Sequence, residues 1–205
     1  YTMMTEIMLD LILLSFLFLE QVQGSELCVP KYKPGRYLIN LTIPGEETSS
    51  VRPLLLNIPS AERFEKSSDN GLRNGGLIGY HGWHSNPWYF DVLSNATNMT
   101  EDYHMILALP FGTGKKESFY CCPAGISPQQ CSDGTYLDAS LGACGWKVSE
   151  KPSIEFRHID DIAYTRTIID LLINDLCVDY KKIFAMGLSD GGSMAARAAC
   201  DLADV

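Results

Sequence analysis

One five-residue segment, GLSDG at Gly187–Gly191, limits what this chain can fold into more than any other feature. It follows an apolar run, Ile183–Met186, and precedes a helix-like run, Ser193–Leu202. When a strand turns sharply into a helix at a G-x-S-x-G segment, the serine is held in strained backbone geometry and its hydroxyl is lifted clear of the sheet. The pattern therefore predicts a tight strand-to-helix corner that carries Ser189, with an ordinary glycine-rich turn as the alternative.

A serine on such a corner is suited to nucleophilic acyl transfer, because the N-terminus of the following helix offers N–H groups where negative charge would form. In corners of this type the acid and then the histidine follow the serine along the chain. All the histidines of this sequence precede Ser189: His81, His84, His104 and His158. We therefore expect a C-terminally truncated chain that stops before its catalytic acid and base; the alternative is a base from an upstream histidine.

Composition favours one globular domain with a sizeable core, because 46% of the 205 residues are hydrophobic and 20% are charged. The formal net charge is −9, and this charge would repel a phosphate backbone. The basic pairs Lys115-Lys116 and Lys181-Lys182 are too short to offset it. We therefore expect no nucleic-acid partner.

The N-terminus resembles a secretion signal. Its apolar run, Leu11–Leu19, is too short for a bilayer that needs about 20 residues, but it matches a signal-peptide core of about 7 to 15. We expect a signal peptide over 1–24, an extracellular domain over 25–205, and no stable membrane insertion after cleavage. Glu6, Asp10 and the lack of a basic residue leave a buried helix or a signal anchor as alternatives.

Cysteines and sequons also fit an oxidising, glycosylating compartment. Three N-x-S/T sequons predict glycosylation at Asn40, Asn95 and Asn98. The strand leading back from Ser189 reaches toward Cys177, and the helix leading away returns toward Cys200, so that both should end near the same edge of the sheet. We predict a disulfide between Cys177 and Cys200.

Residues 111–153 form a long insert that is rich in Gly, Pro and Ser and contains four cysteines: Cys121, Cys122, Cys131 and Cys144. Four thiols allow three disulfide connectivities, among which the sequence does not choose, and Cys28 either joins this set or pairs outside it. Zinc is the rival interpretation, but no C-x-x-C spacing occurs. We expect disulfides, no metal site and no cofactor.

Strand and helix patterns alternate along the rest of the chain. The expected strands cover 37–43, 52–58, 76–80, 105–109 and 181–187, and the expected helices begin near 88, 160 and 193. Alternation of this kind predicts an α/β fold with a mostly parallel central sheet and helices on both faces.

The segment His81-Gly82-Trp83 ends one of these strands, ahead of the first helix. Enzymes with a serine corner use the loop at this place to complete an oxyanion hole with a backbone N–H. We expect the N–H groups of Trp83 and Asp190 to be the two donors and the His81 side chain to be structural. Metal binding by His81 and His84 is the alternative, although a third ligand is not evident.

Aromatic residues are concentrated just after this loop, at Trp83, Trp88, Tyr89 and Phe90. They are suited to line a site for an aromatic acyl group or a sugar ring. Packing of the first helix on the sheet accounts for them equally well, and both interpretations stay open.

Three segments carry a family resemblance: Cys177–Asp179 (CVD), Ile183–Met194 (IFAMGLSDGGSM) and Ala198–Cys200 (AAC). With His81-Gly82 and the helix start at Asp160–Ile162 at matching spacings, the chain resembles the secreted polyhydroxybutyrate depolymerase and feruloyl esterase family of α/β-hydrolases. The resemblance implies further strands after Val205, with a catalytic acid and histidine, and a disulfide like the one expected between Cys177 and Cys200. Two features differ from the family: Asp190 stands where relatives commonly have Asn, and the insert is longer and richer in cysteine.

The sequence therefore predicts a secreted carboxylic-ester hydrolase that acts through an acyl-enzyme on Ser189, with a plant cell-wall feruloyl ester or a polyester as substrate. A catalytically inactive, hydrolase-like secreted binding protein is the first alternative. A serine peptidase of the same fold is the second.

Overall fold

The structure is a computed structural model that describes residues 28–44, 51–60, 75–83, 85–114, 144–148 and 160–203. The strands of the main sheet are β1 (Gly35–Thr42), β2 (Val51–Ile58), β3 (Gly76–Tyr80), β4 (Ile106–Pro110) and β7 (Ile183–Gly187). The α-helices are α3 (Pro87–Ser94), α4 (Ala96–Asp102), α6 (Asp161–Asp170) and α7 (Asp190–Asp201). Shorter elements are β5 (Thr113–Gly114), β6 (Cys144–Gly145), a π-helical turn (Leu171–Asp175) and a 3₁₀ turn (Tyr180–Lys182).

Several expectations lie outside the described residues. These are the signal peptide over 1–24, the middle of the insert with Cys121, Cys122 and Cys131, and the two histidines His84 and His158.

The main sheet has the strand order β1-β2-β4-β3-β7 and is mixed. The pairs β1–β2 and β2–β4 are antiparallel, whereas β3–β4 and β3–β7 are parallel. The prediction of a mostly parallel sheet was therefore wrong for its first half. Residues 43–50 between β1 and β2 are too few for a parallel crossover, which needs a dozen residues or more, and allow only a hairpin-like return.

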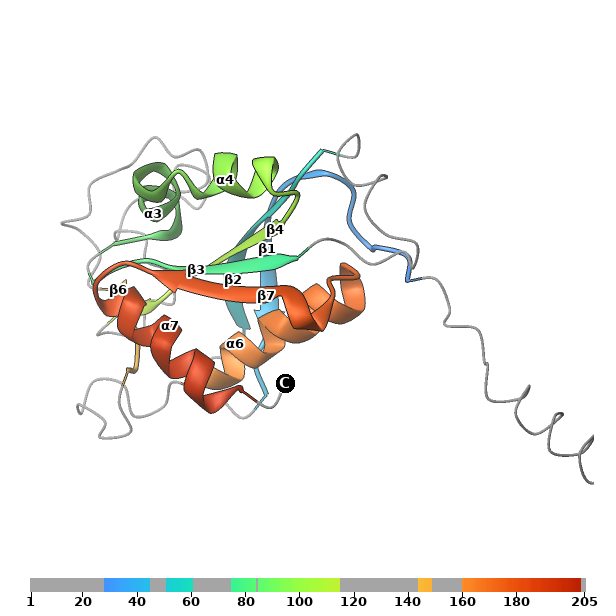
Figure 1. The fold of residues 1–205 in the computed structure, drawn as a ribbon. Coiled ribbons are helices and arrows are strands. Elements are labelled where there is room, and N and C mark those ends of the chain that lie inside the picture. The colour runs from blue at the N-terminus through green and yellow to red at the C-terminus, as the bar shows by residue number, and fades with distance from the viewer. Residues whose placement is uncertain are drawn as a thin grey trace, which may run out of the picture.

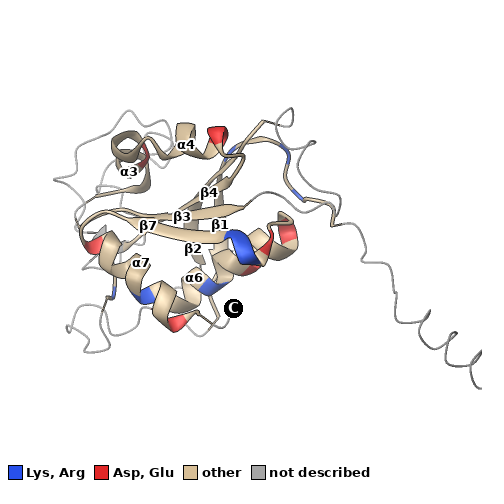
Figure 2. Ribbon diagram, in the orientation of Figure 1, with Lys and Arg blue, Asp and Glu red and all other residues tan. Residues whose placement is uncertain are grey.

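Helices cover both faces of the sheet, as predicted: α3 and α4 lie on one face, and α6 and α7 lie on the other (Figure 1). Figure 2 shows charged residues on the helices, and β1 and β2 each contain an arginine, whereas β3, β4 and β7 contain no charged residue. Every residue of β3 and β4 is buried, which suits strands covered on both faces. Along the described ranges, none of the helices has both the length and the apolar character needed to cross a lipid bilayer.

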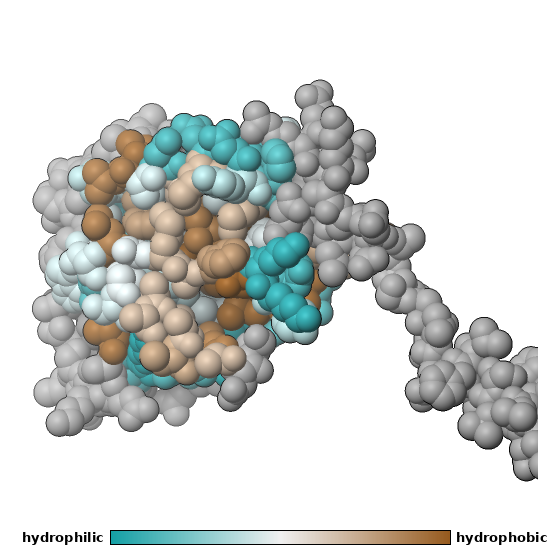
Figure 3. All heavy atoms as spheres, in the orientation of Figure 1, coloured by the Kyte–Doolittle hydropathy of each residue, from teal (hydrophilic) through white to brown (hydrophobic). Residues whose placement is uncertain are grey.

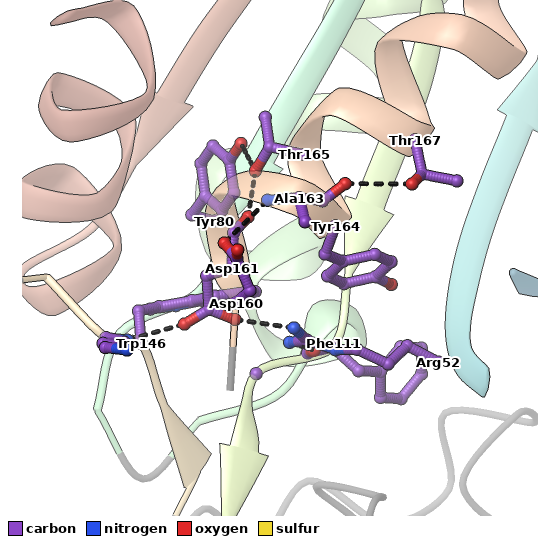
Figure 4. Close-up of polar contacts among 12 residues, drawn as sticks. Arg52, Tyr80, Phe111, Trp146, Asp160, Asp161, Ala163, Tyr164, Thr165 and Thr167 are labelled. Atoms are coloured by element: carbon purple, nitrogen blue, oxygen red, sulfur yellow. Dashed lines mark hydrogen bonds and ion pairs between the residues drawn. The ribbon is translucent and has the colours of Figure 1, made fainter. Parts of the chain in front are cut away.

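A buried ion pair joins the sheet to α6. Arg52 on β2 is 1% exposed, and its Nη1 lies 2.7 Å from Oδ1 of Asp161, the first residue of α6. Its Nη2 donates to the carbonyl oxygen of Phe111 at 2.9 Å, and its guanidinium lies 3.9 Å from the ring centroid of Tyr164 (Figure 4). One side chain thus joins β2, the residue after β4 and the N-terminus of α6.

Substitution of Arg52 by Met should lower the free energy of unfolding by about 3 to 5 kcal/mol, because it leaves the Asp161 carboxylate buried without its cation. Urea denaturation of the full-length protein measures this loss. As a control, Lys31→Ala removes the exposed ion pair with Asp175 and should cost less than about 1 kcal/mol. A loss for Arg52→Met no larger than that of the control would contradict the assignment.

The disulfide prediction was wrong in its partner. Cys177 is bonded to Cys28, with the two Cα atoms 5.7 Å apart, and Cys200 is a free, exposed cysteine. The buried face of α7 contains Met194 and Ala198, and at about 100° per residue Cys200 points roughly 200° away from Ala198. Distances along the strand and the helix placed Cys177 and Cys200 at the same end of the sheet but ignored this rotation.

The Cys28–Cys177 bond joins residues that are 149 positions apart in the sequence, and it restricts the conformations of the unfolded chain. Its loss should therefore raise the entropy of the unfolded chain and lower the stability of the folded protein. Cys28→Ser is expected to lower the free energy of unfolding by up to about 5 kcal/mol. Cys200→Ser, which alters an exposed thiol, should change it by less than about 0.5 kcal/mol. Equal effects of the two substitutions, measured by thermal and urea unfolding, would contradict the pairing.

Candidate active site

Ser189 occupies the corner between β7 and α7, as the sequence predicts. Its backbone angles are φ 53° and ψ −117°, a conformation that L-residues rarely adopt, and its side chain is exposed. A residue held in such a region costs on the order of 1 to 3 kcal/mol and persists only where its surroundings impose it. The hydroxyl therefore stands free of the sheet at the first turn of a helix.

The two glycines of the G-x-S-x-G segment let the corner close. A Cβ on Gly187 would lie 2.1 Å from the carbonyl oxygen of Gly191, and a Cβ on Gly191 would lie 2.1 Å from the carbonyl oxygen of Tyr80. The Leu188 N–H also donates to the Tyr80 oxygen at 3.1 Å. The start of α7 is thus pressed against the ends of both β7 and β3, and no side chain fits at either position.

The loop after β3 lies beside this corner. A Cβ built on Gly82 would be 3.6 Å from Cβ of Ser189 and 3.2 Å from the Leu188 carbonyl oxygen, which places Gly82 beside the candidate nucleophile. Trp83 follows it and is 39% exposed. Asp190 is the first residue of α7, so its N–H has no carbonyl four residues back within the helix. The sequence segments expected to form an oxyanion hole therefore lie together.

The His81 side chain is buried and hydrogen-bonded to backbone on both sides of its ring. Its Nδ1 donates to the Gly82 carbonyl oxygen at 2.8 Å, and its Nε2 accepts from the Gly112 N–H at 2.9 Å. Burial lowers the pKa of His81 from 6.5 to about 4, although the hydrogen bond to Gly82 opposes this. Both contacts require the neutral Nδ1–H form, which supports a structural role for the ring.

The pKa of His81 is lower in the folded protein than in the unfolded chain, so the unfolded chain binds a proton at His81 first as the pH falls. The free energy of unfolding is therefore highest above pH 6.5 and decreases as the pH falls toward 4. The loss should be on the order of 3 kcal/mol. We expect His81→Gln to lose less stability than the wild type between pH 7 and pH 4, as measured by urea denaturation at each pH. Parallel pH curves for the two proteins would contradict this assignment.

A segment that the sequence analysis had placed in the insert also reaches the corner. Residues 144–145 pair with 113–114 as the short sheet β5–β6, and Trp146 follows with 3% exposure. The indole N–H of Trp146 donates to the His81 carbonyl oxygen at 2.8 Å, and its backbone N–H donates to the Asp190 carboxylate at 3.0 Å. Partial burial raises the pKa of Asp190, and the hydrogen bond from Trp146 opposes that shift.

The sequence contained a signal for one of the contacts that hold the elements around the corner, the ion pair between Arg52 and Asp161. Arg52 begins an otherwise apolar expected strand, and an arginine that is buried there needs an acidic partner, for which Asp160 and Asp161 were available. Asp160 instead caps α6 by accepting from the Ala163 N–H at 2.8 Å. No comparable signal marked Trp146, because its contacts depend on where the insert returns to the sheet.

The outer surface of β7 is strongly apolar. Among the described strands β7 pairs only with β3, and Phe184 and Leu188 are 54% and 45% exposed. Figure 3 shows hydrophobic surface across the middle of this face, where Figure 1 places β7. The strand that enters the corner is extended, but it lies at the edge of the described sheet.

The remaining site predictions concern glycosylation and metal binding. The sequon residues Asn40, Asn95 and Asn98 are all exposed. Within the described residues, no three His, Cys, Asp or Glu side chains come together in a way that would hold a metal ion.

The chain is similar in sequence to a known esterase. Over 70 residues, 34% of this chain, it is 48% identical to feruloyl esterase B from Piromyces equi, and this stretch covers 13% of that protein. The predicted resemblance to the polyhydroxybutyrate depolymerase and feruloyl esterase family is confirmed by this similarity. No family model matches the chain.

Solved structures with some similarity include acetyl xylan esterase from Aspergillus awamori, at 18% identity and a TM-score of 0.47 over 80% of this chain and 46% of that one. A protein called sOPH is 16% identical with a TM-score of 0.46, over 84% of this chain and 49% of that one. The chain thus spans about half the length of these structures.

Proposed function

We propose that this protein is a secreted carboxylic-ester hydrolase with Ser189 as its nucleophile, in an α/β-hydrolase arrangement. The observation that carries the proposal is the exposed side chain of Ser189 at φ 53°, between a strand parallel to its neighbour and the N-terminus of α7. An activated serine needs this combination of access and nearby N–H groups. The local identity to feruloyl esterase B supports the same chemistry.

In the proposed reaction, Oγ of Ser189 adds to the ester carbonyl carbon and its proton passes to a general base. The N–H groups of Trp83 and Asp190 hold the oxyanion, and each such donor contributes about 3 kcal/mol to the transition state. The ester C–O bond then breaks, the proton returns to the leaving alcohol, and an acyl-enzyme remains. Water adds in the same way and releases the carboxylic acid.

The general base and its acid partner are proposed to follow Ser189 in chain order, as is usual for a serine on this type of corner. The described histidines do not suit the role. His81 uses both ring nitrogens in backbone hydrogen bonds, and His104 precedes β4, at the end of the sheet opposite Ser189.

Secretion is supported by the Cys28–Cys177 disulfide and by the exposure of all three sequon residues. For the acid half of the ester we propose ferulate or a hydroxyalkanoate. The partly exposed indole of Trp83, which follows Gly82 in the loop beside Ser189, would offer such an acyl group an apolar surface.

Labelling of the full-length protein with a fluorophosphonate tests the nucleophile. We expect one adduct at Ser189, loss of the adduct in Ser189→Ala, and retention in Ser193→Ala, which removes another exposed serine one turn along α7. The hydrolysis of p-nitrophenyl acetate should fall at least about 1,000-fold in Ser189→Ala only.

A folded full-length protein that gives no adduct at Ser189 would overturn the proposal and favour an inactive binding protein. Hydrolysis of peptides in preference to esters would favour a serine peptidase. Rates on methyl ferulate and on short hydroxybutyrate oligomers then decide between the two acid halves.

A further inference from the structure

Two carboxylates from separate helices hold consecutive backbone amides of the segment that follows β6. The Asp190 carboxylate, on the first residue of α7, accepts the Trp146 N–H at 3.0 Å. Oδ2 of Asp161, on the first residue of α6, accepts the next N–H, that of Lys147, at 2.6 Å. Hydrogen bonds to ionised acceptors are about twice as strong as neutral ones, so residues 146–147 are held in a fixed position relative to the starts of α6 and α7.

Trp146 extends this contact to the loop after β3. Its indole N–H donates to the His81 carbonyl oxygen, and its ring centroid lies 5.0 Å from that of His81 and 5.1 Å from that of Tyr80. The peptide groups that follow this carbonyl lead through Gly82 to the Trp83 N–H, one of the proposed oxyanion donors. The position of Trp146 therefore sets the position of that loop.

The packing around Gly145 brings the same groups together. A Cβ on Gly145 would lie 2.1 Å from the indole of Trp83 and 3.0 Å from Oδ2 of Asp190. The Trp83 ring and the Asp190 carboxylate thus both lie against the backbone of β6 at Gly145. Little room is left for the loop to shift without loss of these contacts.

We propose that the side chain of Asp190 is a positioning residue for the oxyanion hole: by accepting the Trp146 N–H, it fixes the indole that holds the His81 carbonyl, and so keeps the Trp83 N–H beside Ser189. The inference rests on the proposed esterase function. The Asp190 side chain itself touches no reacting atom, and its backbone N–H is a separate, proposed donor.

A simpler role for Asp190 is an acidic residue that complements the dipole of α7. That role needs the negative charge, whereas positioning needs a hydrogen-bond acceptor at this place. Asn has almost the same shape as Asp, keeps an acceptor oxygen and has no charge. Asp190→Asn and Asp190→Ala therefore separate the two roles.

The experiment measures kcat and KM for p-nitrophenyl acetate with the full-length protein and its variants. Positioning predicts that Asp190→Ala lowers kcat by about 10- to 100-fold, with KM changed less than about threefold, because the oxyanion forms only after binding. If Asp190→Ala lowers kcat 100-fold, the kcat of Asp190→Asn should be at least about tenfold higher than that of Asp190→Ala. Trp146→Phe should lower kcat similarly, and the double variant Asp190→Ala/Trp146→Phe should lose less than the product of the two effects.

Asp170→Ala serves as the control, because it removes an exposed carboxylate from the C-terminal end of α6 and should keep the wild-type kcat. Amide hydrogen exchange gives a second readout that needs no activity. In Asp190→Ala, exchange at residues 81–83 and 146–147 should become faster, while exchange in β3 and β4 stays the same.

The outcomes separate the two proposals. Equal ester hydrolysis by the wild type and Ser189→Ala overturns the proposed function, in which Ser189 is the nucleophile, and the exchange data still decide whether Asp190 fixes the loop. If the wild type is active but folded Asp190→Ala keeps its kcat within about twofold, or if its exchange at 81–83 is unchanged, the positioning role is wrong. Equal losses in the Ala and Asn variants would assign Asp190 to the helix dipole instead.

Discussion

The contact on which the other features of the site depend is the one between the start of α7 and the ends of β7 and β3. Gly187 and Gly191 allow backbone atoms to meet where any side chain would collide, and the Tyr80 carbonyl accepts the Leu188 N–H. With both neighbours fixed, Ser189 is forced into a conformation with a φ of 53° and a ψ of −117°. The strain at the serine is thus imposed by close packing of the backbone on either side.

Around this corner, polar groups buried in the protein hold the loops in place. The Arg52–Asp161 pair joins β2 to α6, the Phe111 carbonyl bonded to Arg52 precedes the Gly112 N–H bonded to His81, and Asp161 also accepts the Lys147 N–H. Buried ionic groups of this kind are weak evidence for stability, since apolar residues of similar volume often stabilise as well or better. Their arrangement suits a different task, which is to fix loops from distant parts of the chain in one geometry.

Sequence reasoning succeeded where a local pattern decides the structure. The apolar run of β3 predicted a strand with the observed bounds, 76–80. The strand expected over 181–187 is observed over 183–187, because residues 180–182 form a 3₁₀ turn. It failed where the answer depends on which segments meet. The antiparallel β2–β4 pair, the bond from Cys28 to Cys177 and the return of Trp146 to the site join residues far apart in the sequence, and no local periodicity encodes them.

By itself the sequence determined the strand, the tight corner and the helix around Ser189, because glycine spacing and apolar periodicity act over a few residues and are visible in one dimension. Only the tertiary structure decided what surrounds that corner: Gly82 beside Ser189, Trp146 hydrogen-bonded to the loop after β3, and Asp190 turned toward a backbone amide. The physical reason is that these contacts are made between separate elements, so they exist only once the sheet order and the rotation of each helix about its axis are set.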